Sequence, residues 1–300
     1  MLVVSLAPPA YAAKCPADLG RGTLVQVRNP QGDPRPIGIF DSGVGGLTVL
    51  RAIRERLPTE PTIYVADLLH FPYGPRFQDE VRGFAIDIIR YLESRDVKLV
   101  VIACNTATAA ALNHAREMFE VPIVGVISPG AQAAVEITQN NRVGVISTEG
   151  TMRSQEYLHA IKEIDPMVGV YQKACPELVD IVEAGEADSP RAEAALKRDL
   201  EDIERLGADT LVLGCTHYPL LKPAISRVYP GRFQLVDSAT TTAAKVERHL
   251  DHSRLRAGEA TPQHEILVTA VPQQFDRIAA NIFRDDVHAE EVQIWEKQAT

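Results

Sequence analysis

The sequence predicts an α/β protein made of two pseudo-symmetric parallel-sheet domains with a cleft between them. Short apolar runs alternate with amphipathic stretches of helical length, which is the rhythm of successive βαβ units. The apolar runs are nearly continuous in Val, Ile and Leu, as in strands buried on both faces of a parallel sheet. The rhythm restarts half-way along the chain, which indicates two units of similar build.

The first unit is expected to begin near Pro36. Residues 1–35 are rich in Pro, Gly and polar residues, and we expect a poorly ordered extension there. A signal peptide is the alternative, but the apolar start lacks a basic region and carries two prolines. We then expect strands at 36–40, 62–67, 98–104 and 122–127, and helices at 47–57, 79–94 and 106–119.

The second unit is expected to begin with a helix near Gly130. Further strands are predicted at 142–148, 210–215, 233–238 and 265–270, and further helices at 152–164, 176–184, 191–206, 220–228, after 238 and at 273–283. We therefore predict one domain from residues 36–128 plus 239–291 and a second from residues 129–238.

Composition excludes several classes of protein. The chain has 31 basic and 40 acidic residues, and its net charge of −9 disfavours nucleic acid and anionic membranes as partners. No apolar run reaches the roughly 18 residues of a membrane span. The four cysteines form no C-x-x-C pair and the histidines show no ligand spacing, so we expect free thiols, no metal site and a cytoplasmic location.

Two segments of the chain resemble each other. Cys104 lies in LVVIACNTATAAAL and Cys215 in TLVLGCTHYPLLKP, and each follows a predicted strand and precedes a predicted helix. A buried cysteine is usually a small apolar residue, but two copies at matching places in two α/β units favour a shared site. The carboxyl ends of parallel strands are where ligands bind, and a helix N-terminus there favours thiolate.

Two opposed thiols suit one kind of chemistry. One thiolate removes a proton from a carbon while a thiol on the other side returns one, which is racemisation or epimerisation. His217 lies two residues after Cys215 and is a candidate to assist proton transfer, and Asp41 is its counterpart near Cys104.

The run from Asp41 to Gly46, DSGVGG, places a carboxylate and a hydroxyl at the start of a helix, with glycines that let the backbone approach an anion. A helix cap is the structural alternative. A dinucleotide loop with Asp67 as ribose-binding acid is another, although Thr48 replaces the third glycine of that motif.

Together these residues closely resemble the glutamate racemases of the aspartate/glutamate racemase superfamily. The resemblance runs from about Pro36 to Phe283 and is carried by IGIFDSGVGGLTVL, YVAD, PYG, VVIACNTATA, PIVGVISPGAQAAV, VGVIST, LVLGCTHYPLLKP and LVDSA. It implies a two-domain isomerase (EC 5.1.1.3), commonly a homodimer, with its active site in the cleft. Such an enzyme interconverts L- and D-glutamate without pyridoxal phosphate or another cofactor and supplies D-glutamate for peptidoglycan, cell-wall biogenesis and cell shape.

The resemblance also implies roles for individual residues. The catalytic residues would be Cys104 and Cys215, assisted by Asp41 and His217. The substrate-binding residues would be Asp41, Ser42, Tyr73, Gly74, Asn105, Thr106, Thr216 and His217.

The chain departs from the family pattern at two places. It has Ile127-Ser128-Pro129-Gly130 where many relatives read IEPG, and Ala66-Asp67-Leu68-Leu69 where many read ADTA or ADSA. The second departure places bulk before the PYG loop. Two alternative functions follow from the sequence: a racemase of the same superfamily acting on aspartate or another small amino acid, and a non-catalytic two-domain ligand-binding protein.

Overall fold

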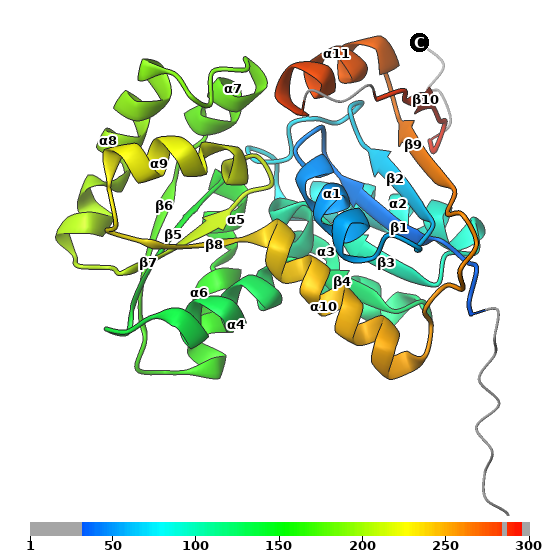
Figure 1. Cartoon of the computed structure of the whole chain (residues 1–300), viewed down its shortest axis with the longest axis horizontal. Coiled ribbons are helices and arrows are strands. Elements are labelled where there is room, and N and C mark those ends of the chain that lie inside the picture. The colour runs from blue at the N-terminus through cyan, green and yellow to red at the C-terminus, as the bar shows by residue number, and fades with distance from the viewer. Residues whose placement is uncertain (1–31, 284–286, 296–300) are drawn as a thin grey trace, which may run out of the picture. The chain divides into compact units, whose positions relative to one another are not determined.

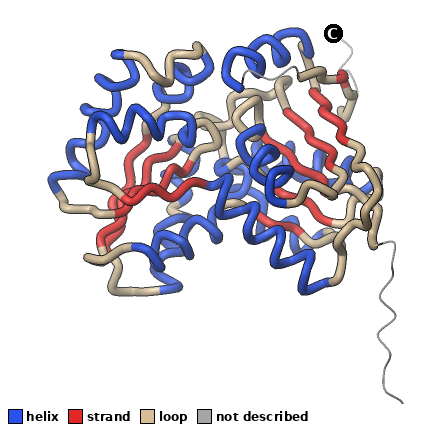
Figure 2. Tube along the Cα trace, viewed as in Figure 1, coloured by secondary structure: helices blue, strands red, loops and turns tan. Residues whose placement is uncertain are grey.

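The computed structural model describes residues 32–283 and 287–295. Within them the chain forms two parallel β-sheets flanked by helices (Figures 1 and 2), so the predicted α/β fold class is confirmed. Most of the predicted extension, and Cys15 with it, lies outside the described residues.

The first sheet has the strand order β10-β9-β2-β1-β3-β4. Its strands are β1 (Ile37–Asp41), β2 (Thr62–Ala66), β3 (Leu99–Ile102), β4 (Ile123–Gly125), β9 (His264–Val268) and β10 (Glu290–Glu291). Successive side chains of a strand point to opposite faces, so β3 sends Leu99 and Val101 into one core and Val100 and Ile102 into another. The helices on these two faces are α1 (Leu47–Arg56), α10 (Ser238–Ser253) and α11 (Pro272–Phe283) on one, and α2 (Gln78–Ser94) and α3 (Asn105–Met118) on the other.

The second sheet has the order β6-β5-β7-β8 and the same construction. Its strands are β5 (Arg142–Ser147), β6 (Gly169–Ala174), β7 (Thr210–Gly214) and β8 (Gln234–Asp237). Helices α4 (Ile127–Ile137) and α6 (Glu156–Ile164) pack on one face, and α7 (Glu177–Glu183), α8 (Pro190–Arg205) and α9 (Lys222–Val228) on the other. The first sheet thus combines strands from the beginning and the end of the described chain. The predicted first domain, residues 36–128 plus 239–291, has the same two parts, but the domain boundaries stay a prediction.

Two predicted helices differ from the structure. The predicted helix at 152–164 is two helices, α5 (Glu149–Ser154) and α6, because Gln155 between them adopts a left-handed conformation with φ of 60°. The predicted helix at 220–228 is a 3₁₀ turn, η1 (Tyr218–Leu221), followed by α9. Strands β6 and β10 were not predicted.

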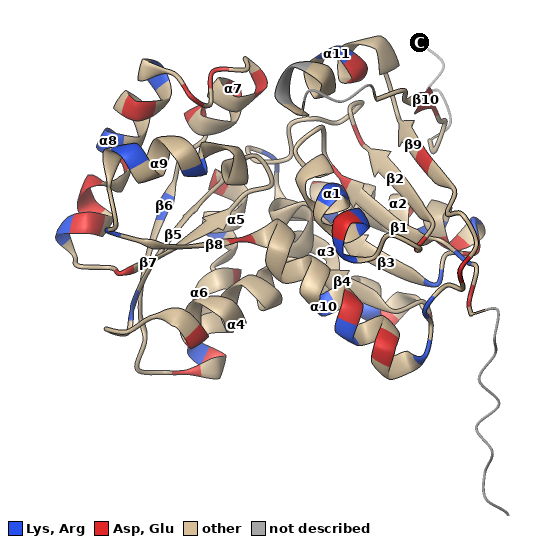
Figure 3. Ribbon diagram, in the orientation of Figure 1, with Lys and Arg blue, Asp and Glu red and all other residues tan. Residues whose placement is uncertain are grey.

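Charged residues lie mainly on the helices around the two sheets. Figure 3 shows Lys and Arg interspersed with Asp and Glu along α1, α8 and α10, and several form pairs such as Arg198 with Glu177 at 2.9 Å. Within the described residues, no helix is both long and apolar enough to span a membrane.

Candidate active site

A cavity of about 250 Å³ is lined by residues that directly follow strands of both sheets. The volume lies below the roughly 300–1,000 Å³ of pockets for drug-sized ligands, so it suits a smaller molecule. Nine of the residues predicted for the site line this cavity: Ser42, Tyr73, Gly74, Cys104, Asn105, Thr106, Cys215, Thr216 and His217. The cavity is also lined by residues that sequence reasoning missed: Phe71, Pro72, Pro75, Thr148, Glu149, Pro176, Val179 and Asp180.

Cys104 begins helix α3 and is its N-cap residue. Its Sγ accepts a hydrogen bond from the backbone N–H of Ala107 at 3.4 Å and lies 3.8 Å from Oγ of Ser42. Burial nevertheless raises the pKa of the Cys104 thiol well above its usual value, and the negative charge of Asp41 raises it further. The N-terminus of α3 does donate to this sulfur, as expected, but burial and Asp41 outweigh its effect on the pKa. The thiol form of Cys104 is therefore favoured.

Cys215 has a different neighbour. Its Sγ lies 3.7 Å from Nδ1 of His217, whose Nε2 lies 3.1 Å from Oε1 of Glu183. Burial lowers the pKa of His217, but hydrogen bonds to Cys215 and Glu183 outweigh it and raise the pKa to about 10. The imidazole is therefore protonated at neutral pH and presents its positive charge to the sulfur of Cys215.

Glu183 was not identified from the sequence. It is the last residue of α7, 34 residues before His217 in the chain, and no motif surrounds it. Only the packing of α7 beside η1 brings its carboxylate to the imidazole.

Asp41 ends β1 and does not line the cavity. It is fully buried; its Oδ2 accepts hydrogen bonds from the N–H groups of Gly43 and Gly46 at 3.1 and 3.0 Å, and its Oδ1 lies 3.4 Å from the Thr216 hydroxyl. Burial raises the pKa of Asp41, opposed by the charge of His217 and by the backbone donors. Asp41 therefore touches the second sheet's Cys-Thr-His segment through Thr216.

The glycine run packs against the same segment. A Cβ on Gly45 would lie 2.5 Å from both Nδ1 of His217 and Oγ1 of Thr216, and one on Gly46 would lie 2.4 Å from Cβ of Asp41. Helix α1 has Gly46 as its N-cap and no side chain caps it, so Asp41 and Ser42 are not its caps. Gly45 therefore allows close contact with the Cys-Thr-His segment, and Gly46 allows the turn to pack on Asp41.

Asn105 and Thr106, the first residues of α3, connect the two sheets. Oδ1 of Asn105 accepts a hydrogen bond from the hydroxyl of Tyr157 at 2.8 Å, and Oγ1 of Thr106 lies 2.8 Å from Oγ1 of Thr148. Sequence reasoning missed both Tyr157 and Thr148, which lie in the second half of the chain.

Other kinds of site find little support. The described residues contain no group of three or more His, Cys, Asp or Glu that could hold a metal ion. Asp67, the acid that a dinucleotide site would offer to ribose, is fully buried and bonded to Tyr73, Thr269 and His70 inside the protein. The site is therefore built around two thiols.

Comparison with known proteins shows the family of the chain. The family model described as Asp/Glu/Hydantoin racemase matches residues 37–246. The chain belongs to this family. Relatives in it include the glutamate racemase of Exiguobacterium sibiricum, 43% identical over 256 residues that cover 85% of this chain and 94% of that protein. The glutamate racemase of Geobacter metallireducens is 46% identical over 81% of this chain and 91% of its own length.

Solved structures of racemases resemble the chain over most of its length. A glutamate racemase isoform from Bacillus anthracis superposes with a TM-score of 0.83 at 37% identity, covering 86% of this chain and 97% of that one. The glutamate racemase of Francisella tularensis, solved in complex with D-glutamate, has a TM-score of 0.82 at 31% identity and covers 87% and 98%.

Proposed function

We propose that the chain interconverts L- and D-glutamate by a cofactor-independent, two-cysteine proton transfer at Cα. One observation carries the proposal: Cys104 and Cys215 follow strands of different sheets, line one cavity, and lie beside different charged groups, Asp41 near Cys104 and His217 at Cys215. The names of the relatives support glutamate as the substrate.

The reaction needs one base and one acid at any moment. The Cys215 thiolate removes the Cα proton of one enantiomer, and the electron pair of that C–H bond moves onto Cα and its carboxylate. The Cys104 thiol then gives its proton to the opposite face, forming the new C–H bond. Cys215 is left as thiol and Cys104 as thiolate, which is the state that the other enantiomer requires.

In this direction Cys215 acts as the base, with protonated His217, held by Glu183, beside its sulfur. In the reverse direction Cys104 must be the thiolate, although burial and Asp41 favour its thiol. We propose that Asp41, whose pKa burial raises, takes the proton that the Cys104 thiol loses, while protonated His217 gives its proton to Cys215, so that the two sulfurs exchange states.

The carboxylates of the substrate need hydrogen-bond donors in the cavity. The cavity offers hydroxyl groups on Ser42, Thr106 and Thr216, and the amide of Asn105. Tyr73 and Gly74 also line the cavity. The family resemblance implies that they bind the substrate.

The test is purified protein with L-glutamate in deuterated buffer and no added cofactor. We expect loss of optical activity by circular dichroism and deuterium at Cα by NMR. Activity with aspartate alone would move the substrate within the superfamily. Ligand-dependent closure without exchange for either amino acid would support the non-catalytic binding protein and contradict the proposal.

The resemblance supplies the remaining parts of the proposal. We infer a cytoplasmic homodimer that provides D-glutamate for peptidoglycan. Light scattering coupled to gel filtration tests the dimer, and rescue of a D-glutamate auxotroph tests the role in cell-wall synthesis; a monomer or a failed rescue by active enzyme would contradict the respective part.

A further inference from the structure

The cavity wall formed by Tyr73 is fixed from behind by a buried carboxylate. Tyr73 is 1% exposed, and its hydroxyl donates a hydrogen bond to Oδ2 of Asp67 at 2.5 Å. Asp67 directly follows β2, and its backbone N–H bonds to the carbonyl of Asp41 at 3.0 Å. The orientation of the Tyr73 ring therefore depends on where the Asp67 carboxylate is held.

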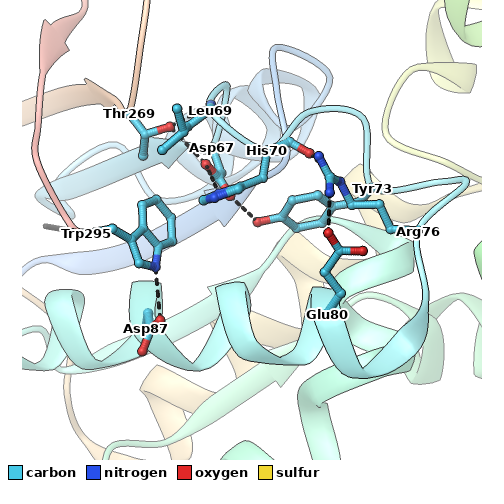
Figure 4. Close-up of polar contacts among 9 residues, drawn as sticks. All are labelled: Asp67, Leu69, His70, Tyr73, Arg76, Glu80, Asp87, Thr269 and Trp295. Atoms are coloured by element: carbon cyan, nitrogen blue, oxygen red, sulfur yellow. Dashed lines mark hydrogen bonds and ion pairs between the residues drawn. The ribbon is translucent and has the colours of Figure 1, made fainter. Parts of the chain in front are cut away.

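Two further side chains hold that carboxylate (Figure 4). The hydroxyl of Thr269, which follows β9, donates to Oδ1 at 2.9 Å, and Nδ1 of His70 lies 2.9 Å from Oδ2. Asp67 is fully buried, so these protein donors stand in for water. His70 directly follows Leu69, the last residue of the segment that departs from the family pattern, and it is the partner of Asp67 that reaches toward the surface.

The C-terminal part of the described chain packs against His70. The imidazole is stacked on the ring of Phe84, with centroids 3.8 Å apart, and the indole of Trp295 meets it edge-on at 4.5 Å. Trp295 is fixed in turn, because its Nε1–H donates to Oδ2 of Asp87 on α2 at 2.9 Å. The backbone N–H of Val292 bonds to the carbonyl of Val268, which anchors the segment beside β9.

We propose that Trp295 is a positioning residue for the active site. Its indole holds the His70 ring against Phe84, His70 and Thr269 hold the Asp67 carboxylate, and Asp67 holds the Tyr73 ring at the cavity wall. The C-terminal segment thereby sets how well the cavity fits its substrate without touching it. This inference rests on the proposed racemase function.

The first experiment is a double-mutant cycle on the KM for glutamate. Trp295→Leu removes the ring that meets His70 edge-on. We expect KM to rise about two- to ten-fold, which corresponds to the free energy of one aromatic pair, and kcat to change less. His70→Asn keeps a side-chain donor for Asp67 but removes the ring. In the His70→Asn background, Trp295→Leu should therefore change KM no further.

Two variants separate positioning from loss of packing. Ile294→Ala shortens a neighbouring side chain that packs on the same core as Trp295, so it is the matched control, and KM should stay within about two-fold of wild type. Trp295→Phe keeps an aromatic edge for His70 and should restore most of the KM. Equal KM changes in Ile294→Ala and Trp295→Leu, or independent effects in the double mutant, would overturn the proposal.

Fluorescence gives a readout that does not depend on turnover. Trp295 is the only tryptophan in the sequence, so intrinsic emission reports on this ring alone. Glutamate should change the emission with half-saturation near KM, and the change should be lost in Tyr73→Phe, which cannot bond Asp67. A wild-type protein that does not racemise glutamate would refute the proposed function; an active one whose emission responds equally in Tyr73→Phe would refute only the role of Trp295.

Discussion

The ends of β3 and β7 look alike in sequence and differ in electrostatics. Each strand leads into a cysteine that lines the cavity and then into a helical segment. Cys104 faces Ser42 and the buried carboxylate of Asp41, whereas Cys215 faces a protonated imidazole backed by Glu183. The strand-to-helix turn thus decides where each sulfur lies, and the neighbouring side chains decide which charged group it faces.

This difference has a functional consequence. In the proposed reaction one sulfur must hold a proton while the other does not. We propose that the contrast between Asp41 and His217 prepares the resting site for one enantiomer, and that a turnover then prepares it for the other.

The largest expected effect is loss of either sulfur. Cys104→Ser and Cys215→Ser should each lower kcat by about 10³-fold or more, because each removes an acid or base that the reaction needs. Polarimetry or circular dichroism with glutamate measures it. Cys175 is a third buried free cysteine and lies outside the cavity lining, so Cys175→Ala is the matched control and should remain active. Wild-type rates in either serine variant would refute the two-base scheme.

The next largest effect distinguishes Asp41, near Cys104, from His217, beside Cys215. Asp41→Asn and His217→Asn should each lower kcat about 10- to 100-fold. One variant should lose more kcat in the L-to-D direction and the other in the D-to-L direction. Enantiomers have an equilibrium constant of one, so kcat/KM must fall equally in both directions and the asymmetry must appear in kcat and KM separately. Full time courses from L- and from D-glutamate measure this. Identical kcat losses in both directions for both variants would remove the proposed division of labour.

A smaller effect, on the stability of the fold, is expected from substitutions of Gly45 and Gly46. An Ala at Gly45 would press its Cβ on His217, and one at Gly46 on Asp41, so each should destabilise the fold by about 1–3 kcal/mol. Gly83 in α2 has open space around its position, so Gly83→Ala is the control and should stabilise by up to about 1 kcal/mol. Urea unfolding measures all three. An unchanged midpoint in Gly45→Ala would show that the halves do not make this contact in solution.

A further effect concerns the pH dependence of stability. The pKa of His217 rises from 6.5 to about 10 on folding, so the folded protein binds the proton more tightly than the unfolded chain. This contribution to stability is complete below pH 6.5 and is lost as pH rises through about 10. His217→Asn should flatten the decline of unfolding free energy over that range, measured by urea unfolding at several pH values. An unaltered slope would contradict a charged His217.

The sequence predicted most of the fold because most strands here are buried on both faces. Strand β6 was missed because all six of its residues, Gly169–Ala174, are only half-buried and include Gln172 and Lys173. It is an edge strand of the second sheet, so its pattern lacks the continuous apolar run of β5 and β7. Strand β10 has two residues and exists only through its pairing with β9.

The site was predictable where local sequence determines position. Cys104 and Cys215 follow apolar strands, so their place at the cavity follows from the pattern around them. The protonation state of Cys104 was not predictable, because it depends on complete burial and on Asp41 from another strand. Glu183, Tyr157 and Trp295 were missed for the same reason: only tertiary packing brings each to its partner.

The most direct test of two opposed sulfurs is the fate of the Cα hydrogen early in the reaction in deuterated buffer. The proton removed by one sulfur stays on that side, and the product receives its hydrogen from the other sulfur. Mass spectrometry of the separated enantiomers at low conversion should therefore find deuterium in the newly formed enantiomer and protium in the remaining substrate, from either starting enantiomer. Product that retains the substrate's own protium would show a single base acting on both faces and would contradict the account.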